Sequence, residues 1–185
     1  MSAGHAGHVD PANKKVALFI AVLALVLAFS ETLGKAAQTS ALAYHIESSN
    51  LWAFFQAKTI RQTTIRTAAE EMESQFGQKA PEAVRKQIET WRKTAERYQS
   101  EPETNEGRKE LMARAKEGEA KRDRAMAAYH NYEVASAAVQ IAIVLASAQI
   151  ITGVAALLWI AYALGAIGVF FSLIGLLWPT AVHLF

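Results

Sequence analysis

Three residues near the N-terminus have the chemistry of metal ligands. His5 and His8 are three residues apart and Asp10 follows closely. Two imidazoles and a carboxylate are a donor set that zinc or copper accepts. The surrounding stretch, MSAGHAGHVDPAN, provides no packed scaffold to hold such a geometry, so these three are weak candidates. We favour a flexible tail over residues 1–15 and expect no metal site and no cofactor.

The chain carries no recognisable catalytic signature. The sequence lacks GxSxG, HExxH and a glycine-rich phosphate loop, and its remaining histidines are scattered. Without cysteine it can form neither a disulfide nor a thiolate metal site. The basic residues Lys121, Arg122 and Arg124 precede an apolar segment and lie among acids, which favours lipid headgroups over nucleic acid as their partner. We therefore expect a protein that is not an enzyme and has no catalytic residues.

Apolar and charged residues are segregated along the chain. Of its 185 residues 52% are hydrophobic and 19% are charged, yet residues 134–185 contain no Lys, Arg, Asp or Glu. A bilayer core of about 30 Å takes about 20 helical residues. We predict three transmembrane helices and a short C-terminal tail, at residues 16–33, 134–153, 155–178 and 179–185. The first is expected to be an uncleaved anchor and not a signal peptide, because its apolar character continues to Leu33.

The segment between the first and second spans, residues 34–133, is typical of helix throughout. Helix-breaking residues cluster at Gly77 with Pro81 and again at Ser100–Gly107. Between these breaks, apolar residues recur at intervals of four and three, as in one seam of a coiled coil: Val84, Ile88, Trp91, Ala95 and Tyr98. The sequence therefore predicts an all-α membrane protein with an extramembrane, antiparallel, coiled-coil-like arm. The alternative is a solvated charged rod.

Small residues recur at helical spacing in all three predicted spans. In the third span they include Gly165, Gly168 and Gly175, and they are matched by alanines in the other two. Lipid tails provide no hydrophobic force between helices, so small side chains stabilise contacts by letting the backbones approach closely. We predict a tight helix bundle in which one small-residue face is left for contacts between subunits.

Polar residues in the spans allow both a functional and a structural interpretation. A carboxylate inside a membrane is a functional candidate by default. Glu31, however, lies at the end of the first span with Lys35 one turn later, and we expect these two to form a structural ion pair. Gln140 and Gln149 in the second span are expected to make interhelical hydrogen bonds.

The stretch SNLWAFFQAKTIRQ places three large aromatic residues in a segment that is otherwise rich in charge. Ser48, Ser49 and Asn50 are good N-cap residues, so a helix is expected to restart before Trp52. We predict that Trp52 and Phe55 are buried against a returning helix or a neighbouring subunit. The remaining candidates of this stretch are Phe54, which widens the aromatic surface, and two polar contacts at its rim, Gln56 and Lys58.

The same stretch resembles the domain-of-unknown-function 4337 family of bacterial membrane proteins, whose hallmark is W-A-[FY]-[FY]-Q-A-K. Residues 52–58 match it in full, and QIAIVLAS at 140–147 opens a final pair of spans, as in that family. The resemblance extends over most of the chain but brings no assigned activity. Relatives carry basic residues between the last two spans, whereas ITGVAALLW here has none.

The distribution of basic residues predicts the orientation in the bacterial inner membrane. Lys14 and Lys15 precede the first span, whereas the final connection and the C-terminus carry no Lys or Arg. The positive-inside rule then places the N-terminus in the cytoplasm and the arm in the periplasm. Lys116 and Lys121, near the second span, argue for the opposite orientation.

The function that we expect is structural. The chain would form a homo-oligomer in contact with membrane lipid, and its arms would act as a scaffold for lipid or for an unidentified membrane-protein partner. We expect no binding of nucleic acid. The alternative is an oligomeric pore or transporter, for which Ser136, Gln140 and Ser147 share one face of the second span.

Overall fold

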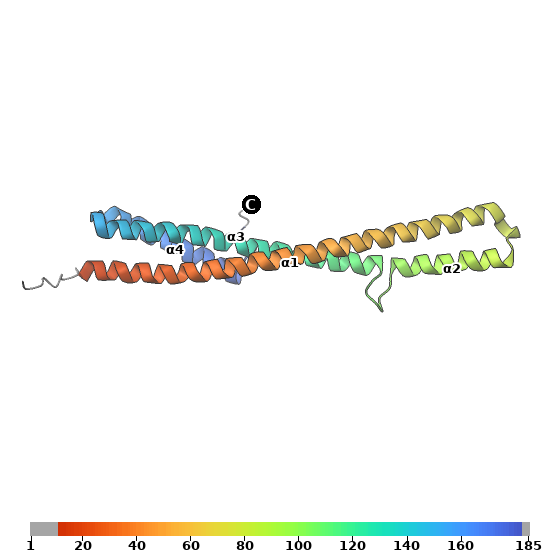
Figure 1. Cartoon of the computed structure of the whole chain (residues 1–185), viewed down its shortest axis with the longest axis horizontal. Coiled ribbons are helices and arrows are strands. Elements are labelled where there is room, and N and C mark those ends of the chain that lie inside the picture. Colours follow the sequence, from red (N-terminus) through yellow and green to blue (C-terminus); the bar gives the residue numbers. More distant parts are fainter. Residues whose placement is uncertain (1–10, 183–185) are drawn as a thin grey trace, which may run out of the picture. The chain divides into compact units, whose positions relative to one another are not determined.

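The computed structural model describes residues 11–182, with side chains from residue 13 onward, and the described part is helical without strands. Four α-helices, at Pro11–Phe76 (α1), Glu82–Gln99 (α2), Arg108–Thr152 (α3) and Ala155–Leu177 (α4), follow one another, with a short 3₁₀ turn at Gly77–Lys79 after α1 (Figure 1). The helix breaks therefore lie where Gly77, Pro81 and the stretch 100–107 predict them.

Backbone conformation explains two of the connections. Gly77 ends α1 with a φ of 50°, and Gly153 separates α3 from α4 with a φ of 71°. Both values lie in the left-handed region, which glycine enters without the steric cost that a side chain brings. The connection between α3 and α4 needs only Gly153 and Val154, which supports the predicted division of the long C-terminal apolar run at this point.

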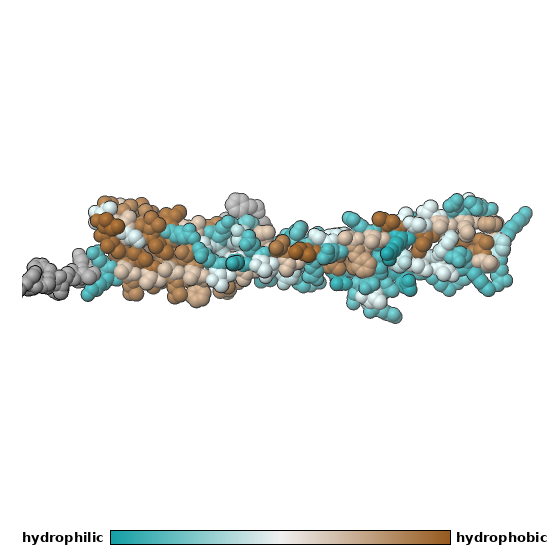
Figure 2. Space-filling view, in the orientation of Figure 1, coloured by the Kyte–Doolittle hydropathy of each residue, from teal (hydrophilic) through white to brown (hydrophobic). Residues whose placement is uncertain are grey.

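The helices form two compact units. Unit 1 comprises residues up to Ala41 and from Asp123 onward, and unit 2 comprises Leu42–Arg122. Three helices, α1, α3 and α4, are long and apolar enough to cross a membrane. Brown, hydrophobic side chains gather over much of unit 1, whereas unit 2 is a mixture of teal and white with smaller brown patches (Figure 2).

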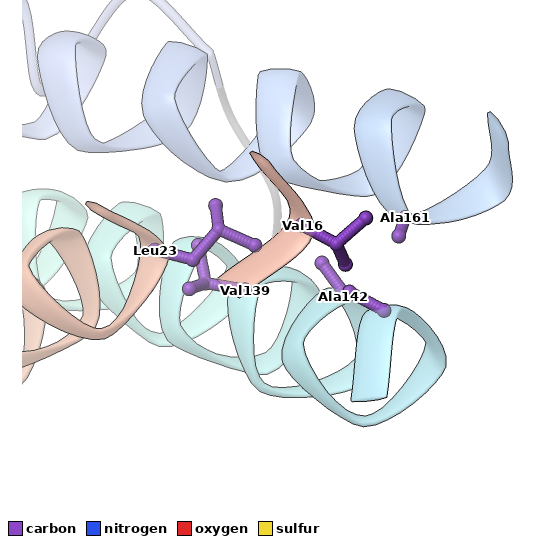
Figure 3. Close-up of a cluster of buried hydrophobic side chains, with 6 residues drawn as sticks. Val16, Leu23, Val139, Ala142 and Ala161 are labelled. Carbon is purple, nitrogen blue, oxygen red and sulfur yellow. The ribbon is translucent and has the colours of Figure 1, made fainter. Parts of the chain in front are cut away.

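Unit 1 is a three-helix bundle whose buried core combines alanines with valine and leucine side chains. Val16 and Leu23 from α1 meet Val139 and Ala142 from α3, and Ala161 from α4 closes the cluster (Figure 3). Glycines on α4 allow this close packing: a Cβ on Gly165 would lie 3.0 Å from Leu23 Cδ2, and one on Gly168 would lie 2.3 Å from Val139 Cγ2. The glycine face predicted for α4 is thus used within a single chain.

The small-residue face of α1 behaves differently. In α3 the predicted alanine face is buried, with Ala135, Ala142 and Ala146 fully covered. In α1 the larger Val16 and Leu23 take the inner side. The alanines of the first span instead lie exposed on the surface of unit 1, at positions 17, 21, 24 and 28.

Polar groups in unit 1 pair differently from the prediction. Glu31 was expected to pair with Lys35, but its Oε1 accepts a hydrogen bond from Gln140 Nε2 on α3 at 3.1 Å. No ion pair between Glu31 and Lys35 is found among the described residues, and the donor to this carboxylate comes from α3 instead. Gln140 is therefore an interhelical donor as predicted, whereas no hydrogen-bond partner is found for the buried Gln149 Oε1 in the described part of the chain.

Unit 2 pairs α1 with α2 and with the beginning of α3. Gln62 donates to the carbonyl oxygen of Ala95 at 2.9 Å, and Arg92 pairs with Glu73 nearer the turn at Gly77–Lys79. Later residues of α1 thus contact earlier residues of α2, so the two helices are antiparallel. The inner face of α2 carries the predicted seam, with Ile88 and Ala95 buried.

Helix α1 does not restart at residues 48–50. It continues through them, and Ser48 Oγ donates to the carbonyl oxygens of Tyr44 and His45 within the same helix. The predicted N-cap was therefore wrong. Ser48 is instead buried opposite Gly118 of α3. A Cβ added at Gly118 would lie 3.2 Å from Ser48 Cβ. Small residues on both helices allow this close approach.

Candidate functional site

A cluster of charged and aromatic side chains in unit 2 surrounds Lys58. Its side chain is only 7% exposed, and its Nζ lies 3.1 Å from Glu101 Oε2 and 4.0 Å from Glu106 Oε2. The ammonium also lies 5.4 Å from the ring centre of Phe54 and 5.6 Å from that of Tyr98. We call these five residues the Lys58 cluster. A buried ammonium requires such compensation, because removing it from water is costly.

Arg108, the first residue of α3, makes a second set of contacts beside this cluster. Its Nε donates to Thr59 Oγ1 at 2.8 Å, and its Nη1 donates to Gln62 and to Gln99. The guanidinium carbon also lies 5.1 Å from the ring centre of Phe55. One arginine thus joins the starting turn of α3 to α1 and to the last turn of α2.

The aromatic residues of the motif anchor α3 to α1. Phe55 and Trp52 pack edge to face, with ring centres 5.4 Å apart, against the buried pair Leu51 and Leu111. The indole Nε1 of Trp52 donates to Glu119 Oε1 at 2.8 Å. The hydrogen bond satisfies the polar edge of a ring whose face is apolar, which is the usual arrangement of a half-buried tryptophan.

Glu110 secures the connection between α2 and α3. Its carboxylate accepts hydrogen bonds from Ser100 Oγ at 2.6 Å and from the backbone N–H of Glu101 at 3.1 Å. Gly107 leaves room for this carboxylate: a Cβ there would lie 2.1 Å from Glu110 Oε2 and 2.4 Å from the Glu101 nitrogen. An acidic side chain in the first turn also complements the helix dipole of α3.

These contacts lower the pKa of two carboxyl groups. The hydrogen bond from Lys58, followed by its charge, holds the pKa of Glu101 below the usual value for glutamate. The hydrogen bond from Ser100, together with the backbone N–H of Glu101, does the same for the pKa of Glu110. Both groups therefore stabilise the folded connection while they are ionised, and this contribution is lost as the pH falls through their lowered pKa values.

We expect the connection at residues 100–107 to open in acid. As the pH falls below about 4.3, the ordinary pKa of glutamate, the amide of Glu101 should lose protection against hydrogen exchange after correction for the intrinsic rate. Glu110→Gln should reduce this protection already at neutral pH and make it less dependent on pH. A Glu101 amide that stays equally protected from pH 7 to pH 3 would contradict the proposed role of the two carboxylates.

The structure brings together only part of the predicted site. Trp52 and Phe55 face α3 but are half-buried, and Phe54 is partly exposed beside Lys58. Lys58 is one of the more deeply buried polar residues and not a rim contact, whereas Gln56 is exposed. The position of Lys58 was mispredicted because it lies one heptad after the buried Leu51 and so on the inner face of α1.

Sequence reasoning did not assign several residues on the other side of this cluster. The sequence pattern predicts only a helix break at residues 100–107, which includes Glu101, and it assigns no role to Arg108 or Glu110. One available signal was Gly107 followed three residues later by Glu110, a pattern typical of a helix N-terminus. The other was the buried register of Lys58, which requires an acidic partner.

The metal candidates His5, His8 and Asp10 lie outside the described residues. Within residues 11–182, no group of three His, Asp or Glu side chains is arranged to hold a metal ion.

Comparison with known protein families supports the resemblance seen in the motif. Residues 12–178 match the family described as domain of unknown function (DUF4337). No curated protein and no solved structure matches the chain. The match includes the motif, the connection that it anchors and all three apolar helices, and the chain therefore belongs to the DUF4337 family.

Proposed function

We propose that this chain is a non-enzymatic integral membrane protein of the bacterial inner membrane, in which unit 1 lies in the bilayer and unit 2 forms an extramembrane arm. The arm acts as a scaffold that presents a surface to protein partners or to lipid. The protein works as a homo-oligomer.

One observation carries the membrane placement. Large apolar side chains on the surface of unit 1 are more than half exposed on each of its three helices: Leu18, Leu25, Phe29, Val144, Ile151, Trp159, Phe170 and Leu176. Exposed apolar surface of this extent is unfavourable in water and requires lipid or protein around it. Trp159 and Trp178 suit the bilayer interface, where an amphipathic ring is favoured.

The contacts of Lys58 support a structural role for unit 2. Its ammonium already binds Glu101 and Glu106 and lies beside two aromatic rings. An ion pair of this kind joins α1 to the α2–α3 connection. The hallmark motif thereby acquires a structural role, which is to hold α1 to the α2–α3 connection of the arm.

The exposed alanines of α1 support the proposed association of subunits in the bilayer. Ala17, Ala21, Ala24 and Ala28 share a face that no helix within residues 11–182 covers. Small residues on a lipid-facing helix favour close contact with a neighbouring helix.

A pore is the second candidate, and the exposed hydrogen bond between Gln140 and Glu31 favours it. In a ring of subunits this polar pair would line an aqueous path. Repeated absence of single-channel currents from purified protein under an applied voltage would exclude the pore and leave the scaffold.

The membrane placement predicts a specific result in cells. The protein should stay in the membrane fraction after alkaline carbonate washing, because the apolar surface of unit 1 is held by lipid. A reporter that is active only in the periplasm, inserted at Asn105 in the α2–α3 connection, should be active. Release by carbonate would contradict membrane insertion, and activity of a cytoplasm-only reporter at Asn105 would reverse the proposed orientation.

A further inference from the structure

The outward faces of the helices in unit 2 differ in charge. On α2 the exposed pairs Glu82–Lys86 and Glu89–Lys93 face solvent, and Glu117–Lys121 does the same on α3. The outward face of α1 has no charged residue at six successive positions: Ile46, Asn50, Ala53, Ala57, Ile60 and Thr64. We call these six residues the outer seam. All of them are exposed, and Ile60 is 67% exposed.

The spacing of the outer seam is that of a coiled coil. Its positions follow one another at intervals of four, three, four, three and four, which keeps them on one side of an α-helix. The inner face of α1 has the same spacing in Leu51, Phe55, Lys58 and Gln62, and that face packs against α2 and α3. Helix α1 of unit 2 thus has two coiled-coil faces, of which one is covered and one is exposed.

We propose that a second copy of this chain covers the outer seam, forming a parallel, in-register coiled coil through α1. The inference deepens the homo-oligomer proposed above and rests on it. Two copies inserted in one membrane with the same orientation present α1 in the same direction, so the pairing is parallel. In that pairing Ile46 packs on Ile46 of the second copy, and Ile60 does likewise.

The composition of the outer seam fits pairing with itself. Asn50 occupies the a position of a heptad, where an asparagine pairs with its counterpart and specifies register and a low oligomer number. In the flanking g and e positions, Leu42 faces Glu47 of the second copy and Gln56 faces Arg61 of the second copy. No like charges meet, so nothing opposes the parallel register. A charged partner of another kind would leave the six uncharged positions without complementary groups.

Single cysteines test the proposal directly, because the native chain contains none. Ile46→Cys should yield a disulfide-linked dimer under mild oxidation in native membranes, since identical core positions of a parallel coiled coil lie within reach of a disulfide. His45→Cys is the matched control: it is the adjacent residue and is also exposed, but it points away from the outer seam. Equal cross-linking of both variants, or of neither, would overturn the proposal.

A charge in the outer seam provides a second test. Ile60→Glu should convert the oligomer to a smaller species in native mass spectrometry, whereas His45→Glu should leave it unchanged. Both side chains are exposed within one chain, so helix content should stay the same in each variant. An oligomer that persists in Ile60→Glu would overturn the outer seam as its interface while leaving the proposed function intact. A native protein that is monomeric in detergent and in nanodiscs would overturn both.

Discussion

Replacing Gly168 with alanine is expected to destabilise unit 1, and replacing it with leucine is expected to prevent normal packing of α4. A Cβ at this position would lie 2.3 Å from Val139 Cγ2 and 3.1 Å from the carbonyl oxygen of Ala135. Rotation of Val139 can relieve the first contact, but the second involves the backbone of α3. Overpacking of a close contact costs about 1–3 kcal/mol, so the alanine variant should melt at a lower temperature.

The leucine variant should cost more than this, because its side chain has no space between α3 and α4. Thermal unfolding in detergent, followed by circular dichroism, measures both variants. Ala163→Leu is the matched control, since Ala163 is on the same helix but exposed. If Gly168→Leu melts at the same temperature as Ala163→Leu, then α4 does not pack on α3 through its glycine face.

Trp52→Ala is expected to detach the start of α3 from α1 in unit 2. The indole packs on Phe55 and beside Leu51 and Leu111, and its Nε1 donates to Glu119. Because the ring is half-buried, the loss should be about 2–3 kcal/mol, somewhat less than for a fully buried tryptophan. Trp52→Phe keeps most of the packing and removes only the hydrogen bond, for an expected loss of about 1 kcal/mol.

Phe76→Ala provides the matched control for Trp52→Ala, because it removes an aromatic ring of α1 that is 40% exposed and does not belong to the Lys58 cluster. Limited proteolysis between residues 100 and 122, together with the melting temperature, should rank the variants as Trp52→Ala, then Trp52→Phe, then Phe76→Ala. Membrane insertion should be unaffected in all three. A Trp52→Ala protein with native protease resistance would indicate that Trp52 serves an exposed partner surface instead.

The helical architecture was readable from the sequence because its signals are local. Glycine and proline end helices through their own backbone conformations, and long apolar runs identify the candidate spans without knowledge of what they pack against. Gly77, Gly153 and the α2 seam accordingly lie where expected. The glycines of α4 also face inward as expected, since small residues at helical spacing need a close neighbour.

The predictions that were wrong concern side chains whose contacts are set by residues distant in the sequence. Glu31 was assigned to the nearby Lys35, but α3 brings Gln140 to it. Ser48 has the chemistry of an N-cap, yet close packing of Gly118 against it favours an uninterrupted helix. Lys58 was placed at a rim because lysines are rarely buried, whereas Glu101 and two aromatic rings make burial possible here.

The Lys58 cluster lies at the C-terminal end of α2, so separation of α2 from α1 is expected to begin at the opposite end of α2. Between the turn at Gly77–Lys79 and this cluster, α2 is held on α1 by exposed pairs such as Arg92–Glu73 and by a short buried seam. An isolated helix of 18 residues is only marginally stable in water. Local opening that begins at the turn can therefore separate α2 from α1 progressively. The opening stops where Gln62, Lys58 and Arg108 hold the C-terminal end of α2 and the connection that follows it. Opening of α2 is therefore expected to be graded, largest beside the turn at Gly77–Lys79 and smallest where its C-terminal end is held.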